Sequence, residues 1–251
     1  MRYAILSDVH ANLEALTAVV ADLERRGADR ILFLGDAVGY GADPLSCLDL
    51  IESRADVQIA GNHDQMTATV PNEDDKGGGG ERASIRWTRG RLGGEARQRL
   101  LALDLEWTEG DLHCVHGSPF SPETWHYILN EKDAETGFAA NGARIIFVGH
   151  THLPAVFAET ECRRFFWGVS RKIRQMEPKT VSLSMRYRYI INPGSVGQPR
   201  DGDPRAAYGI YCPEEKHFSL CRVPYDIEQA AQKIRSAGLS HDLAQRLFLG
   251  K

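Results

Sequence analysis

The feature that most constrains this sequence is the way short apolar runs end in polar side chains able to bind ligands. The clearest case is Gly61-Asn62-His63-Asp64, which places an amide, an imidazole and a carboxylate directly after the apolar residues 57–60. A short apolar run of this kind is typical of a buried strand. Four more apolar runs end in the same way, and the polar residues that follow them are Asp8 with His10, Asp36, His116, and His150 with His152.

Helical segments alternate with the first of these runs. Residues 11–26 carry apolar side chains at helical spacing and are followed by Gly27, a residue typical of a helix C-terminus. A second helix is expected over residues 43–54, beginning at Asp43-Pro44. Alternation of strand and helix predicts a largely parallel sheet with helices on its faces. Because the carboxyl ends of parallel strands lie along one edge, we expect the polar residues to converge there.

The remainder of the chain is more varied. Residues 65–94 are loosely organised, and the polar run 72–76 followed by four glycines predicts a flexible loop over 72–80. Residues 159–189 alternate in polarity, which favours antiparallel strands or a hairpin, and carry eight Lys and Arg against three Glu. Further elements are expected as helices over 81–91, 95–103, 226–236 and 240–250, and as strands over 112–115, 143–148, 190–192, 207–212 and 217–223. We interpret residues 1–251 as one domain, with 159–189 as a small, basic, β-rich, cap-like insertion.

Composition excludes several classes of protein. With 251 residues, 42% hydrophobic and 25% charged, the chain can bury a full core. A formal net charge of -4 leaves no overall field that would draw it to nucleic acid or an anionic membrane. Five cysteines without CxxC spacing favour reduced thiols. No apolar run suggests a signal peptide or membrane span, so we expect a cytoplasmic protein.

The polar residues at the strand ends form a donor set suited to metals. Two carboxylates, one amide oxygen and four imidazoles fit manganese, iron or zinc better than magnesium. Seven ligands are too many for one tetrahedral site. Two ions about 3.5–4 Å apart that share a carboxylate form an arrangement that hydrolyses phosphate esters.

Taken together and in order, the motifs resemble the calcineurin-like metallophosphoesterase superfamily. They are Asp8-x-His10, Gly35-Asp36, Gly61-Asn62-His63-Asp64, His116-Gly117 and Gly149-His150-x-His152. The resemblance implies an α/β sandwich of mixed β-sheets flanked by helices. It also implies a dinuclear site in which a metal-bridging hydroxide attacks the phosphorus.

The same resemblance implies a role for each residue. His63 corresponds to the catalytic histidine, which protonates the leaving oxygen or stabilises charge on the phosphoryl group. Asp36 bridges the two ions. The first ion would also be held by Asp8, His10 and His152, and the second by Asn62, His116 and His150.

One departure from the superfamily pattern is informative. In its protein Ser/Thr phosphatases, Gly-Asp continues into an Asp-Arg pair that orients the catalytic histidine, but here Gly35-Asp36 is followed by Ala37-Val38. The chain is closer to small bacterial and archaeal phosphodiesterase-like members, including the stretch 192–200. Asp64 is then a candidate to orient His63, although a helix cap is an equal alternative.

Alternatives remain at this stage. Each motif alone is more often a helix cap or a turn residue than a ligand. The predicted function is hydrolysis of a phosphodiester, a nucleotide phosphate or a pyrophosphate bond in a small substrate. A non-catalytic metal-binding scaffold, as in a retromer subunit, and a protein phosphatase are the alternatives, and a nucleic-acid substrate is disfavoured. We hypothesise that the basic segment 163–188 and the 65–94 loop wall the cleft, with phosphate within reach of Arg82, Arg86, Arg89 and Arg91.

Overall fold

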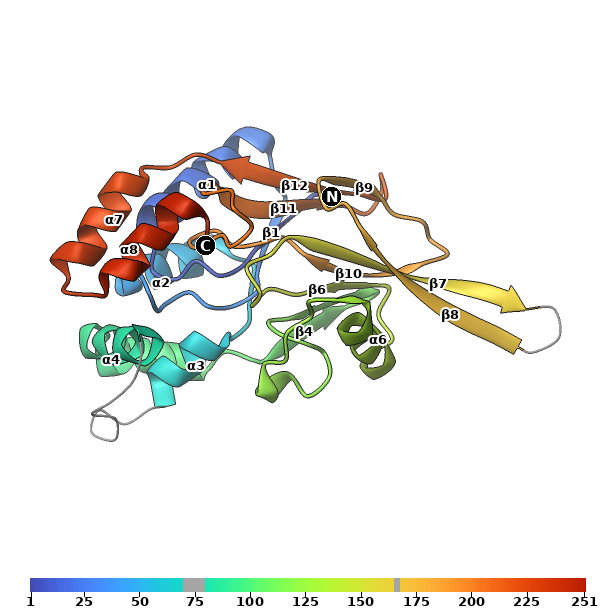
Figure 1. Ribbon diagram of the computed structural model, residues 1–251, viewed down its shortest axis with the longest axis horizontal. Helices are drawn as coiled ribbons and strands as arrows, with labels where there is room; N and C mark the ends of the chain where they lie inside the picture. The colour runs from blue at the N-terminus through green and yellow to red at the C-terminus, as the bar shows by residue number, and fades with distance from the viewer. Residues whose placement is uncertain (70–79, 165–167) are drawn as a thin grey trace.

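A computed structural model describes residues 1–69, 80–164 and 168–251 and shows two β-sheets packed face to face with helices outside them (Figure 1). The first sheet has the order β3-β2-β1-β11-β12-β9. Its strands are β1 (Tyr3–Leu6), β2 (Arg30–Phe33), β3 (Val57–Gln58), β9 (Thr180–Ser182), β11 (Ala206–Cys212) and β12 (His217–Val223). The second sheet has the order β4-β5-β6-β10-β7-β8. Its strands are β4 (Glu106–Glu109), β5 (Leu112–Val115), β6 (Ile145–Phe147), β7 (Ala155–Arg164), β8 (Gly168–Met176) and β10 (Arg188–Asn192).

Both sheets are mixed. Parallel pairing is confined to β3-β2-β1 and β5-β6-β10, and the other neighbours are antiparallel. The mixed-sheet sandwich is therefore confirmed, but the expectation of a largely parallel sheet is wrong. The physical reason is the short connections in the second half of the chain, such as the turn from β11 to β12, because a tight turn joins only antiparallel strands.

The helices occupy the surfaces of the sandwich. Those of the first half are α1 (Leu13–Arg26), α2 (Pro44–Arg54), α3 (Asn62–Thr69), α4 (Gly80–Arg91) and α5 (Gly94–Leu101). The 3₁₀ helix η1 (Pro122–Thr124) and α6 (Glu131–Ala140) follow, and the chain closes with α7 (Ile227–Ser236) and α8 (His241–Leu249). The described residues contain no helix long and apolar enough to cross a membrane.

Local signals in the sequence explain most helix ends. Asn12 caps α1 by accepting a hydrogen bond from the Ala15 amide, and Gly27 ends it in the left-handed conformation at φ 73°. Asp226 and Ser240 cap α7 and α8 through their side chains. These predicted boundaries are confirmed to within two residues.

Four elements were not predicted: α3, β4, η1 and α6. α3 begins inside the Gly61-Asn62-His63-Asp64 motif, and β4 pairs with β5 along the edge of the second sheet. α3 has almost no amphipathic pattern, since its ligand and cap residues take the buried positions, and so the sequence did not reveal it. Apart from Gly80, the flexible loop expected over 72–80 lies outside the described residues.

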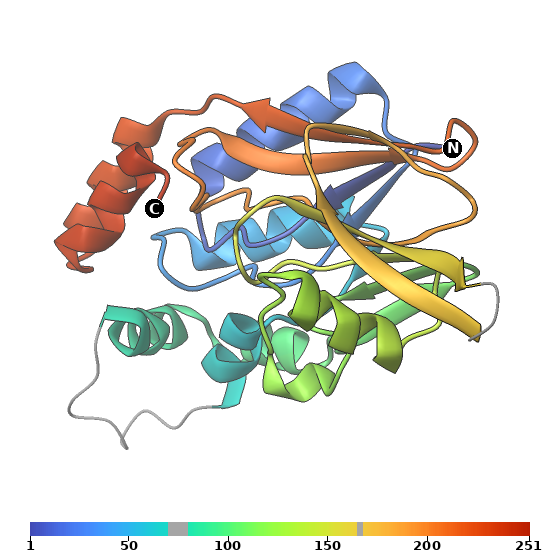
Figure 2. The ribbon, with the colours of Figure 1, turned by 45° about the vertical axis from the view of Figure 1, so that its right-hand side comes forward.

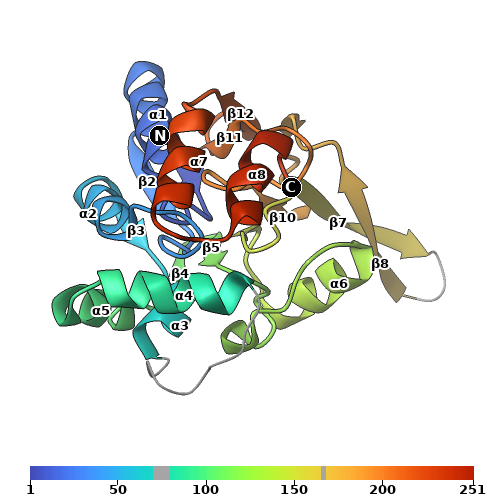
Figure 3. The same cartoon turned by 60° about the vertical axis from the view of Figure 1, so that its left-hand side comes forward.

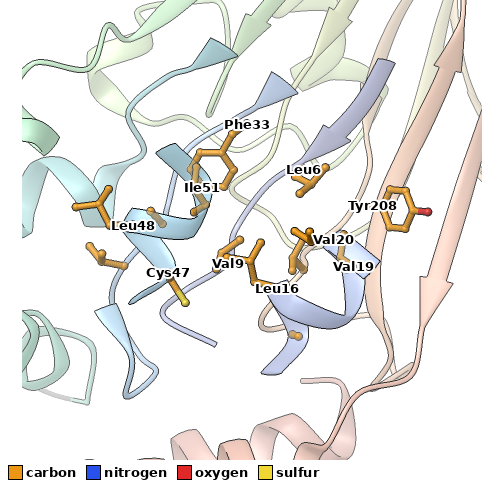
Figure 4. Packing of buried hydrophobic residues seen from close by; sticks show 14 of the residues in the cluster. Leu6, Val9, Leu16, Val19, Val20, Phe33, Cys47, Leu48, Ile51 and Tyr208 are labelled. Atoms are coloured by element: carbon orange, nitrogen blue, oxygen red, sulfur yellow. The ribbon is translucent and has the colours of Figure 1, made fainter. Parts of the chain in front are cut away.

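The main cores lie between the two sheets and between the first sheet and its helices. Figure 4 shows the second of these, with Leu16, Val19 and Val20 of α1 beside Leu6 of β1 and Phe33 of β2. Burying such a side chain contributes about 1.5–3 kcal/mol. The packing holds the carboxyl ends of β1 and β2 in fixed positions. Four cysteines are buried and unpaired: Cys47, Cys114, Cys212 and Cys221.

Residues 159–189 form strands, as expected. β7 and β8 make a long antiparallel ribbon that projects on the side away from α7 and α8 (Figures 1 and 2). β9 leaves this ribbon and pairs with β12 in the first sheet. The segment therefore contributes strands to both sheets.

Candidate metal centre

The polar residues predicted at the strand ends meet in the structure, but they come from two sheets. Asp8 and Asp36 follow β1 and β2 of the first sheet, whereas His116 and His150 follow β5 and β6 of the second. The expectation that all of them lie along one edge of one sheet is therefore corrected. Face-to-face packing brings the carboxyl ends of both parallel portions together.

The grouped side chains are buried and close enough to share metal ions. Two clusters have ligand atoms within 4.8 Å of one another: Asp8, His10 and His152 in one, and Asp36, His116 and His150 in the other. A third cluster of the same kind contains His10, Asp36 and His63. Asn62 is buried beside them, and its Oδ1 has no hydrogen-bond partner in the part of the chain that the structure describes.

Backbone carbonyls orient three of the imidazole rings. Each ring places Nδ1 beside a carbonyl oxygen, which can only accept, so Nδ1 carries a proton and the neutral ring presents the lone pair of Nε2 to the site. The three contacts are His10 with Val38 at 3.2 Å, His116 with Leu34 at 2.7 Å, and His152 with Gln198 at 2.6 Å. This is the outer hydrogen bonding that metal-binding histidines normally have.

The contact between His10 and His152 tests whether a cation fits. Their Nε2 atoms are 3.0 Å apart, and burial holds the pKa of both rings well below the usual value. In the neutral rings each Nε2 offers only a lone pair, so neither can donate to the other. The Asp8 Oδ1 atom lies 3.3 Å from His152 Nε2 and is buried without a hydrogen bond. A bound cation would satisfy all three atoms.

The pKa shifts of the carboxylates and of His116 are consistent with a bound cation. Burial raises the pKa of Asp8 to about 6. Burial also opposes the charge on Asp36, but His116 and His63 outweigh it and hold the pKa of Asp36 well below its usual value. The pKa of His116 is raised to about 9 because Asp36, 3.3 Å away, overcomes the effect of burial. The two carboxylates thus favour positive charge beside His116 Nε2, and a bound cation would take the place of the proton on that nitrogen.

The backbone is strained at most of these residues. Five of the seven predicted ligands have positive φ, between 49° and 65°: Asp8, His10, Asp36, His150 and His152. Residues other than glycine seldom adopt this conformation, and such strain clusters at functional sites. The turns after the strands thereby aim the side chains inward.

Gly61 is required by its surroundings rather than by its backbone conformation. Its φ is not positive, so it does not supply a turn that only glycine can make. A Cβ at this position would lie 2.1 Å from Asp36 Oδ1, the atom that accepts the His63 amide at 2.8 Å. Gly61 therefore makes room for the Asp36 carboxylate.

The role of Asp64 is also resolved. Its Oδ2 accepts the amides of Asp36 at 2.7 Å and Gly61 at 3.1 Å, and its Oδ1 accepts that of Val38 at 3.2 Å. The carboxylate therefore caps the start of α3 and holds the loop after β2. It makes no recorded contact with the ring of His63 among the described residues.

His63 is held by residues that the sequence analysis missed. Its ring lies 4.4 Å from that of Tyr40 and 4.7 Å from that of His10, between centroids. Its Nε2 atom lies 3.3 Å from Glu81 Oε1, at the start of α4. Tyr40 stands only four residues after Asp36, a proximity that could have pointed to it, whereas nothing in the sequence marked Glu81.

Comparisons with known proteins agree with this geometry. The family described as "Calcineurin-like phosphoesterase superfamily domain" matches residues 1–215. The chain belongs to this superfamily.

Similar members of the superfamily are archaeal and bacterial. The chain is 37% identical to the uncharacterized protein MJ0912 of Methanocaldococcus jannaschii, over 99% of this chain and 98% of that protein. It is 25% identical to the phosphodiesterase YfcE of Escherichia coli K12, over 84% of this chain and 86% of YfcE. The crystal structure of a metallophosphoesterase from Sphaerobacter thermophilus has a TM-score of 0.84 and 39% identity, covering 100% of this chain and 99% of that one. The predicted family and fold are confirmed.

Four of the seven predicted ligands, Asp36, Asn62, His150 and His152, line a cavity of about 560 Å³. His150 and Tyr127 both line it and stack on each other, with ring centroids 4.2 Å apart. The other lining residues are Tyr40, His63, Gly80, Glu81, Arg200, Ser240, Asp242, Leu243 and Arg246.

Among the described side chains, none of the basic residues proposed to wall the cleft lines this cavity. Within the described side chains of the basic segment, Arg171 and Arg188 pair with Glu159 instead. Arg89 donates to the carbonyls of residues 67 and 68, and Arg91 stacks on a tryptophan. Of the 65–94 loop, residues 80 and 81 do reach the cavity.

Proposed function

We propose that the chain is a metal-dependent phosphoesterase that hydrolyses a phosphodiester, a nucleotide phosphate or a pyrophosphate bond at a two-metal site. The observation that carries this proposal is the convergence of oriented imidazoles and buried carboxylates, with His10 Nε2 and His152 Nε2 only 3.0 Å apart. The similarity to a named phosphodiesterase supports the reaction class.

The residues divide between two ions. Asp36 Oδ2 lies 3.6 Å from His10 Nε2 and 3.3 Å from His116 Nε2, so Asp36 would be the carboxylate that both ions share. Asp8, His10 and His152 would complete one ion, and Asn62, His116 and His150 the other. Nitrogen and oxygen donors in this mixture favour manganese, iron or zinc. Two such ions would supply positive charge that polarises the phosphoryl group and acidifies water.

His63 would act as the general acid. Its Nδ1 is buried against Gly39, where a Cβ would come within 2.4 Å, so Nδ1 is closed to substrate. Its Nε2 faces Glu81, whose side chain is about half exposed at the cavity. In this proposal the proton is on Nε2, which donates a hydrogen bond to Glu81 before substrate binds. When substrate binds, its leaving oxygen replaces Glu81 as the acceptor and receives the proton.

The alternatives are a non-catalytic scaffold and a protein phosphatase. A scaffold has no need for an acid, yet His63 is present and oriented. The test is metal content together with hydrolysis of an aryl phosphodiester in added Mn²⁺, comparing the wild type with Asp36→Asn and His63→Ala. We expect turnover by the wild type, loss of both metal and turnover in Asp36→Asn, and loss of turnover with metal retained in His63→Ala. A fully loaded wild type without turnover would support the scaffold.

A further inference from the structure

Two arginines line the cavity without carboxylate partners. Arg200 donates Nη2 to Gln198 Oε1 at 3.1 Å, while its Nε is buried and has no hydrogen bond. For Arg246, on α8, the described residues provide neither an ion pair nor a hydrogen bond to the guanidinium. An arginine facing a cavity with unused donors is prepared to bind an anion, because guanidinium groups recognise phosphate and carboxylate in a planar, bidentate manner.

The fold holds these two arginines in place. Leu243 and Leu247 of α8 pack in one buried cluster with Tyr40, over whose ring the Arg200 guanidinium lies at 6.0 Å. The Gly202 amide donates to the Gly250 carbonyl at 2.9 Å, which ties the end of α8 to the chain just after Arg200. Both guanidinium groups are therefore attached to fixed backbone.

The cavity runs from the metal centre to α8. Figure 3 shows α8 on one side and α4 on the other, and residues of both helices line the cavity between them. Three carboxylates also line it. Asp36 belongs to the metal centre and Glu81 contacts His63, which leaves Asp242, one helical turn before Arg246 but not within 4.0 Å of it. Arg200 and Arg246 are the cationic side chains among the described residues that line the cavity. Arg200 lies beside the predicted ligands, because its amide donates to the His152 carbonyl at 3.3 Å, whereas Arg246 reaches the cavity from α8.

We propose that Arg200 and Arg246 form an anion subsite for a second phosphoryl group of the substrate, while the metal centre holds the phosphoryl group that reacts. This inference rests on the proposed function and narrows it to substrates with two phosphoryl groups, such as those joined by a phosphoanhydride bond. A cavity of about 560 Å³ lies within the range of small-molecule sites. Arg246, on α8, lies beyond the residues 1–215 matched by the superfamily domain, whereas Arg200 lies within them.

The first test measures binding without turnover. Calorimetry on the Mn²⁺-supplied protein compares orthophosphate with methylenediphosphonate, which carries two phosphoryl groups and is not hydrolysed. We expect the diphosphonate to bind about 10- to 100-fold more tightly than orthophosphate, and Arg246→Gln to remove that advantage. Arg235→Gln is the matched control, because Arg235 lies on α7, pairs with Glu228 and does not line the cavity. An unchanged preference in Arg246→Gln would overturn the proposal.

The second test separates this inference from the proposed function. An aryl phosphodiester with one phosphoryl group and a nucleoside diphosphate are compared as substrates. Arg246→Gln should raise the ratio of KM for the diphosphate to KM for the aryl diester about 10-fold or more. If wild type cleaves the aryl diester but not the diphosphate, the subsite is wrong and the phosphoesterase stands. If wild type cleaves neither substrate with its metals bound, the proposed function itself fails.

Discussion

His10 Nε2 and His152 Nε2 lie 3.0 Å apart, although both rings direct Nδ1 at a backbone carbonyl oxygen. Two neutral rings in this arrangement turn lone pairs toward each other. The contact is unfavourable unless a cation accepts both lone pairs, so folding and metal binding should be coupled.

Metal removal should therefore destabilise the protein. With free metal at about 100 times its dissociation constant, binding contributes about 2.7 kcal/mol, which for a chain of this size is about 5–10 °C in Tm. We expect a chelator to lower Tm by that amount and added Mn²⁺ to restore it, as measured by differential scanning fluorimetry. His152→Ala should abolish the response, while the exposed His241→Ala should keep it. A chelator-insensitive Tm in the metal-loaded wild type would contradict the coupling.

The effect of removing the His63 side chain on kcat should depend on the leaving group of the substrate. In His63→Ala we expect kcat to fall about 10²- to 10⁴-fold for substrates with alkyl leaving groups. The fall should be much smaller for p-nitrophenyl esters, because p-nitrophenolate departs without protonation. Bound metal, measured by elemental analysis, should stay at the wild-type level. Equal losses for both leaving groups would argue against an acid role.

Gly61→Ala should damage the site more than its size suggests. The added Cβ would lie 2.1 Å from Asp36 Oδ1, so the shared carboxylate must move. We expect metal content and turnover to fall by an order of magnitude or more. Gly90→Ala is the control, since a Cβ there meets nothing within 4 Å inside α4 and should stabilise the helix by about 0.5–1 kcal/mol. A fully active Gly61→Ala variant would show that Asp36 can shift freely.

Asp22 should make a pH-dependent contribution to the free energy of unfolding, and this contribution should be independent of the metal centre. Burial alone would raise its pKa, but hydrogen bonds from Tyr208 at 2.6 Å and Arg26 at 2.7 Å prevail, and the pKa is lowered. The pKa of an aspartate in the unfolded chain is about 3.9, and a carboxyl whose pKa is lower in the folded protein stabilises the fold at pH values above that. This stabilisation is lost as the pH falls through the pKa of the folded protein.

The corresponding variant is Asp22→Asn. We expect it to cost about 1–2 kcal/mol in free energy of unfolding at pH 7, measured by urea denaturation, and progressively less below pH 4. Glu24→Gln, which breaks an exposed pair with Arg54, should cost less than about 1 kcal/mol at every pH. A constant cost for Asp22→Asn from pH 7 to pH 3 would contradict the linkage.

The sequence determined the elements with strong local signals and the chemistry of the site. The spacing of apolar residues and the caps at Asn12 and Asp226 predicted α1 and α7 because these interactions are local. The motifs, in their order along the chain, predicted that aspartates and histidines would lie together at one site. In the structure the predicted aspartate and histidine ligands are close to one another. α3 escaped prediction because its buried positions are polar.

Only the tertiary structure decided how those residues meet. The ligands come from two sheets, and no local pattern reports which sheets pack face to face. Glu81, Arg200 and Arg246 reach the cavity from α4, from the loop after β10 and from α8, far apart in sequence. Positive φ at Asp8 and Asp36 is imposed by surrounding contacts against local preference. Packing between residues far apart in the sequence, rather than local conformational propensity, therefore defines the cavity and the strained turns that position the ligands.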